Sequence, residues 1–174
     1  MLDNKRIEEA KSNVKSYLSE GLLKKEIFKE LVYNTYVRNF QESLNLAEKL
    51  FKEKSSNLWL IVVSYYSMFY VANAVLYKLG FKVGDKIAHK ITADALIVYV
   101  KDRLKDNLIE NYEKASEEAL AISNNLIQTF DFERSKRSRI QYETTEEIKQ
   151  SKAITSFKRT KEFSFEMEKI LTKI

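Results

Sequence analysis

Residues 57–90 read NLWLIVVSYYSMFYVANAVLYKLGFKVGDKIAHK, an apolar segment that leads to a glycine and then to the only histidine of the chain. The apolar part, residues 58–79, has the length of a membrane-spanning helix. Polar side chains interrupt it, namely Ser64, Ser67, Asn73 and Lys78, together with four tyrosines. We therefore expect a central helix of a cytoplasmic protein, buried on most of its sides, and no membrane span.

The composition favours long helices with short connections. The chain has 174 residues, no proline and only three glycines, whereas average usage of about 5% would give roughly 8 or 9 prolines. Proline interrupts helices and marks turns, so its absence favours helical structure. A hydrophobic content of 44% is enough to form a core. We expect one domain over residues 1–174.

The spacing of apolar residues predicts a compact, all-α, up-and-down bundle of five to six helices and no strand. The expected helices cover residues 3–18, 24–54, 58–79, 86–104 and 107–127, with a last helix from Thr144 onward. Gly21 is expected to end the first helix, and Ser56 or Asn57 to cap the third. Residues 128–142 are expected to form a loop, and Thr144 with Glu147 a capping box.

A basic cluster stands just before the last predicted helix. It comprises Arg134, Lys136, Arg137 and Arg139, within a chain of net charge +5. Arginines beside the free N–H groups of a helix start form a good phosphate site. Internal salt bridges with Asp131 and Glu133 are the alternative for the same residues.

The last helix carries a second basic element. Lys149, Lys152, Ser156 and Arg159 fall on one helical face, and no acidic residue occurs from residue 148 to residue 161. Such a stripe could follow a nucleic-acid backbone with salt-sensitive, non-specific binding. An ordinary exposed helix face is the competing interpretation.

Candidate catalytic groups are few. His89 could act as a general base, but the sequence names no partner for it, so we expect a structural hydrogen bond across the bundle. Tyr65, Tyr66 and Tyr70 are expected in the core, where their hydroxyl groups need partners such as the arginines near residue 139. Without cysteine, paired metal ligands or a phosphate-binding glycine loop, the sequence predicts no metal site and no cofactor.

Two segments resemble a known family. Ser64–Phe69 (SYYSMF) in a long apolar helix, followed by Gly80 and His89, is similar to the first half of a HEPN domain (higher eukaryotes and prokaryotes nucleotide-binding). Arg139–Tyr142 (RIQY), followed by a helix with apolar and aromatic residues, is similar to the second half. That helix contains Ala153, Phe157 and Phe163.

The resemblance implies a helical homodimer that binds RNA or nucleotides. Ribonuclease members carry an arginine followed, after four to six residues, by a histidine. Thr144, Thr145 and Glu146 stand at those distances from Arg139, so the pair is absent. Two alternatives stay open. One is a divergent, metal-independent ribonuclease or toxin that uses Arg139, Tyr142 and His89, and the other is the protein partner of a nucleotidyltransferase in a toxin–antitoxin pair.

Overall fold

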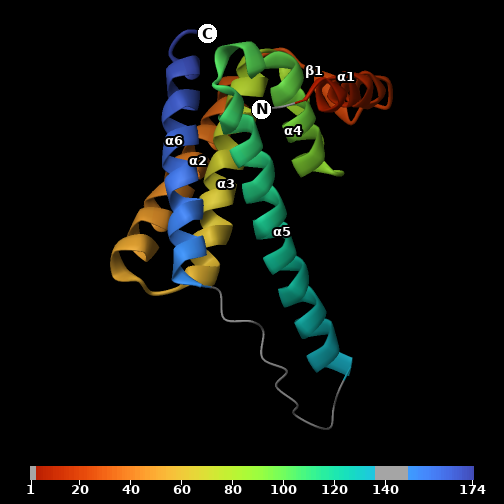
Figure 1. Cartoon of the computed structure of the whole chain (residues 1–174). Coiled ribbons are helices and arrows are strands. Elements are labelled where there is room, and N and C mark those ends of the chain that lie inside the picture. Colours follow the sequence, from red (N-terminus) through yellow and green to blue (C-terminus); the bar gives the residue numbers. More distant parts are fainter. Residues whose placement is uncertain (1–2, 136–148) are drawn as a thin grey trace.

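The computed structural model describes residues 3–135 and 149–174, and within them the chain forms six α-helices (Figure 1). The α-helices are α1 (Asn4–Ser19), α2 (Glu30–Glu53), α3 (Asn57–Lys78), α4 (Ala88–Tyr99), α5 (Asp106–Ser135) and α6 (Gln150–Leu171). A short 3₁₀ helix, η1 (Lys101–Arg103), follows α4, and two strands complete the fold, β1 (Leu23–Lys25) and β2 (Phe81–Val83). The expected all-α bundle is confirmed.

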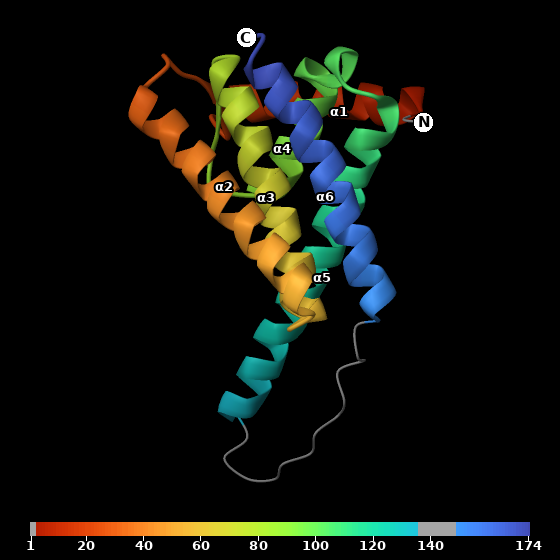
Figure 2. The ribbon, with the colours of Figure 1, turned by 90° about the vertical axis from the view of Figure 1, so that its left-hand side faces the viewer.

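Helix α3 lies at the centre, and the other long helices pack around it. Helices α2, α6 and α5 run beside it with alternating direction, while α1 lies across one end of the bundle (Figures 1 and 2). Fourteen of the 22 residues of α3 are buried. Among the described residues, α3 is the one helix long and apolar enough to cross a membrane, and two thirds of its most apolar window is buried within the fold.

Two strands correct the expectation of a purely helical chain. β1 and β2 pair antiparallel, with Leu23 opposite Val83 and Lys25 opposite Phe81. Three residues are too few to show the alternation that identifies a strand, and the partner lies almost sixty residues away. Because β1 occupies residues 23–25, α2 starts at Glu30 instead of the predicted residue 24.

At three helix ends, the residue that the local sequence favours as a cap or a stop has the expected geometry. Gly21 has φ +70° after α1, and the Leu22 N–H donates to the Tyr17 carbonyl, as in a Schellman motif. Gly80 has φ +90° after α3. The Ser56 hydroxyl accepts the Trp59 N–H and caps the start of α3.

Other boundaries differ from the predictions. α4 ends at Tyr99 and continues as η1, and α5 runs to Ser135, beyond the predicted end at residue 127. The first part of the predicted loop, residues 128–135, is therefore helical. The rest of that loop and the Thr144–Glu147 capping box lie outside the described residues, and the described part of the last helix begins at Gln150.

A buried carboxylate links α1, α4 and α5 through its polar contacts. Asp94 is fully buried, and its Oδ1 lies 2.6 Å from Nη2 of Arg6. Its Oδ2 accepts hydrogen bonds from Asn13 and Tyr17, both at 3.0 Å. Arg6 also pairs with Glu113 at 2.7 Å. Two hydrogen bonds and an ion pair compensate the desolvation of Asp94, so the group fixes α1 across the end of the bundle.

We predict that Asp94→Ala lowers the free energy of unfolding by about 2–4 kcal/mol, since Arg6, Tyr17 and Asn13 lose their common acceptor. Glu113→Ala is the matched control, because this carboxylate is partly exposed and Arg6 keeps Asp94; its expected cost is about 1 kcal/mol or less. Urea denaturation measures both. Equal losses in the two variants would contradict the assignment of Asp94 as the centre of this network.

Candidate functional site: a basic end of the bundle and a histidine in the core

The predicted phosphate-binding residues have different positions in the structure. Lys149 and Lys152 are exposed at the start of α6. Arg159 lies one to two turns further along and pairs with Glu118 of α5 at 3.2 Å, so part of its charge is already compensated. Arg134 belongs to the last turn of α5. Lys136, Arg137, Arg139 and Tyr142 lie outside the described residues.

The predicted stripe along α6 does not continue past its first turn. Ser156, which was expected between Lys152 and Arg159 on an exposed face, is fully buried against the bundle. Thr160, one turn further, is also buried and donates to the carbonyl of Ser64 at 3.1 Å. Periodicity places residues on one face but does not say whether that face is covered. The exposed lysines of the predicted stripe are therefore confined to the helix start.

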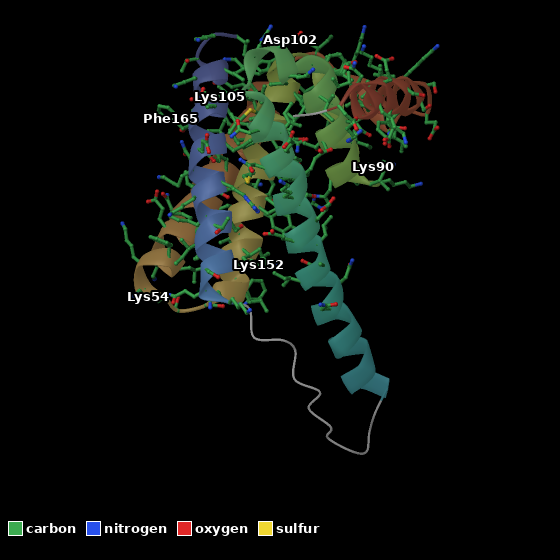
Figure 3. All side chains as sticks on the ribbon, viewed as in Figure 1. Lys54, Lys90, Asp102, Lys105, Lys152 and Phe165 are labelled. Atoms are coloured by element: carbon green, nitrogen blue, oxygen red, sulfur yellow. The ribbon has the colours of Figure 1, made fainter. Side chains whose placement is uncertain are left out.

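Tertiary structure adds lysines that the sequence analysis did not connect with this site. A pocket of about 210 Å³ lies between the end of α2 and the start of α6. Its lining residues are Leu50, Phe51, Lys52, Lys54, Asn57, Leu60, Gln150 and Ile154. Lys54 and Lys152 lie at the same end of the molecule (Figure 3). We call the surface formed by Lys49, Lys52, Lys54, Lys149 and Lys152 the basic end.

Helix dipoles reinforce the positive potential there. Both α3 and α6 begin at the basic end, so the partial positive charges of their first turns lie beside the lysines. Ser56 caps α3, whereas no side chain caps α6 at Lys149 among the described residues. Lysines beside the starts of two helices form an arrangement suited to anions such as phosphate. No local signal in the sequence links residues 52–54 with residues 149–152.

His89 lies elsewhere, in a polar cluster inside the bundle. Its Nδ1 is 2.5 Å from the hydroxyl of Tyr65 on α3, and Ser116 of α5 donates to the same hydroxyl at 3.0 Å. The hydrogen bond expected for His89 across the bundle is therefore present. The hydroxyl of Tyr65 pairs with His89 and Ser116, where arginines near residue 139 had been expected.

The hydrogen bonds determine the protonation of the cluster. Because Ser116 donates to Tyr65, the Tyr65 hydroxyl is free to donate to Nδ1 of His89, which leaves the proton of a neutral imidazole on Nε2. Burial raises the pKa of Tyr65 to about 12. Burial also lowers the pKa of His89, so the imidazole is neutral at pH 7.

Aromatic rings surround the imidazole. The ring centroids of Phe69, Tyr65 and Tyr66 lie 4.8, 5.4 and 6.1 Å from that of His89. The hydroxyl of Tyr112 is fully buried beside Tyr65 and Thr92 without a well-formed hydrogen bond. Among the described residues, no group of three acidic or histidine side chains could hold a metal ion.

Comparisons with known proteins identify no family for this chain. No protein-family model matches the chain. A search of curated proteins also gives no significant match.

We predict that His89 makes stability depend on pH. Its folded-state pKa is below the ordinary 6.5, so the unfolded chain binds more protons below that pH. The stabilisation is fully present above about pH 6.5 and is lost as the pH falls through 6.5 toward the folded-state pKa. Between pH 7.5 and pH 5.5, the wild type should lose more free energy of unfolding than His89→Gln, whose amide can still accept from Tyr65.

Urea denaturation at the two pH values measures this difference, and the carboxylates common to both proteins cancel in the comparison. Proton NMR of the single histidine gives its pKa directly. A midpoint above 6.5, or an equal loss of stability in both proteins, would contradict the prediction.

Proposed function

We propose that this chain is an RNA- or nucleotide-binding module of the HEPN type, which holds phosphate groups at its basic end, acts as a homodimer and lacks the ribonuclease pair of that family. The observation that carries the proposal is that the exposed lysines at the end of α2 and at the start of α6 gather at one end of the bundle, where two helices start and where Lys52 and Lys54 line a pocket. Phosphate is the anionic group that such an arrangement binds most readily.

The local charge balance supports this. Residues 49–54 and 149–152 carry five lysines and a single glutamate, Glu53. A concentration of positive charge at one end attracts a polyanion and orients it during association.

Binding without cleavage is the better-supported form of the proposal. His89 belongs to α4 and pairs with Tyr65, whereas α2, α3 and α6 form the basic end. The only histidine is therefore not among the residues around the pocket, and its Nδ1 already has a protein partner.

We predict that Lys54→Glu combined with Lys152→Glu weakens binding of a labelled single-stranded RNA by more than tenfold. The slope of log K against log salt should also decrease by about 1.4, because each lost phosphate contact on a single strand contributes about 0.7. Fluorescence anisotropy at several salt concentrations measures both quantities.

Lys5→Glu combined with Lys15→Glu is the matched control. It makes the same change in net charge on α1, where Lys5 and Lys15 are both exposed, and this helix lies across the other end of the bundle (Figures 1 and 2). Equal weakening of RNA binding by the two pairs of substitutions would mean that the effect comes from net charge alone. Unchanged affinity in the Lys54/Lys152 variant would exclude the basic end as the binding surface.

The homodimer in this proposal is supported by an exposed apolar patch at the start of α2. Ile27 and Leu31 are 86% and 80% exposed, and Phe28 lies between them. The hydroxyl of buried Tyr77 accepts the Lys29 N–H at 3.1 Å, which fixes the backbone that presents the patch. Because α3 is largely covered by its neighbours, this patch is a better dimer surface than the central helix.

We predict that Ile27→Glu combined with Leu31→Glu converts a dimer into a monomer, since a two-fold contact would place four glutamates in an apolar interface. Light scattering after size-exclusion chromatography gives the mass. Leu46→Glu, an equally polar change at another exposed leucine of α2, should leave the dimer intact. A monomeric wild type, or an unchanged mass in the double variant, would exclude this surface.

A further inference from the structure

One face of α3 is partly exposed, although most of the helix is buried. Trp59, Val63, Tyr66 and Tyr70 recur at spacings of four, three and four residues, so they share one side of the helix. Trp59 is 53% exposed, and the other three are partly exposed. We call these four residues the aromatic face of α3. Trp59 is the only tryptophan of the chain.

This face starts at the basic end. Trp59 belongs to the first turn of α3, together with Asn57 and Leu60 of the pocket lining. Lys54 precedes it by five residues and lies at the same end of the molecule as Lys152 (Figure 3). An exposed indole ring therefore stands at the same end of the bundle as the lysines proposed to hold phosphates.

Positive charge also borders the other end of the face. The ring of Tyr66 contacts that of His89, 6.1 Å between centroids, in the first turn of α4. Lys86 and Lys90 flank His89 and are exposed, and the side chain of Lys90 extends away from α4 (Figure 3). The aromatic face thus runs between two groups of lysines.

We propose that the aromatic face of α3 binds single-stranded RNA, with one base stacked on Trp59 and another on the platform formed by Tyr66 and Tyr70. The proposal rests on the function proposed above and names its ligand class. Exposed aromatic rings beside a basic groove are the general means by which proteins bind unpaired strands, because every base has a face that can stack.

The distance between the two aromatic platforms favours a single strand over a duplex. Tyr66 and Tyr70 lie 6.1 Å apart between ring centroids and form one platform. Trp59 precedes Tyr66 by seven residues, which is about 10 Å along a helix at 1.5 Å per residue. Successive bases in a duplex strand are only about 3.4 Å apart. Bases on the two platforms must therefore be separated from each other and free of a complementary strand.

Charge argues against a second copy of this chain as the occupant of the face. Lysines border both of its ends, Lys54 at one and Lys90 at the other. A two-fold contact between two such faces would bring positive groups together at each end, in either helix direction. A polyanion instead gains favourable interactions at both ends.

The single tryptophan makes the test direct. Titration with an unlabelled 12-nucleotide oligouridine should quench the fluorescence of Trp59 and protect it from acrylamide, whereas duplex RNA of the same length should do neither. In anisotropy assays with the labelled oligonucleotide, Trp59→Leu should lower the affinity about tenfold. Trp59→Phe keeps an aromatic ring and should stay within about threefold of the wild type.

The outcomes separate the two proposals. If Lys54→Glu with Lys152→Glu weakens binding but Trp59→Leu does not and no quenching occurs, the basic end stands and the aromatic face is overturned. If the protein binds no RNA at low salt, both are overturned. Acrylamide protection that rises with protein concentration in the absence of RNA would assign the face to a second copy and overturn its role as an RNA surface.

Discussion

Burial of α3 is the constraint on which the rest of the structure depends. The helix has apolar side chains almost all the way round, so no single neighbour can remove them from water. Helices α2, α5 and α6 therefore surround it, and α4 closes part of the remaining side. The direction of α3 brings its start together with the start of α6 and the end of α2, and this coincidence creates the basic end.

The same burial requires that polar groups on α3 find partners inside the bundle. Tyr65 satisfies its hydroxyl with His89 and Ser116, and Asn73 donates to Thr92 and to the Phe69 carbonyl. These bonds join α3 to α4 and α5 at defined positions, because a buried hydroxyl or amide without a partner is costly. His89 is therefore explained first by the folding of the bundle. Its neutral form is what the folded state favours.

Function, in contrast, is proposed for surfaces that the core leaves uncovered. The aromatic face of α3 begins at Trp59, at the same end of the bundle as the basic end, so electrostatic attraction and base stacking would act on the same strand. The apolar patch at Ile27 and Leu31 belongs to the opposite end of α2. Dimerisation and RNA binding would consequently use different surfaces, and neither would block the other.

The sequence by itself determined the helical class, the central position of α3, the end of α1 at Gly21, a cap for α3 at Ser56 or Asn57, and the hydrogen-bonded role of His89. These follow from periodicity, local backbone preferences and the need to satisfy buried polar groups, all of which act over a few residues or within one helix. Only the tertiary structure decided that Ser156 is buried, that Arg159 pairs with Glu118, and that Lys52 and Lys54 lie beside α6. The strands β1 and β2 belong to the same group. Each of these features depends on contact between residues from about 40 to 100 positions apart. No pattern along the chain indicates which of the polar helix faces will be covered by neighbouring helices.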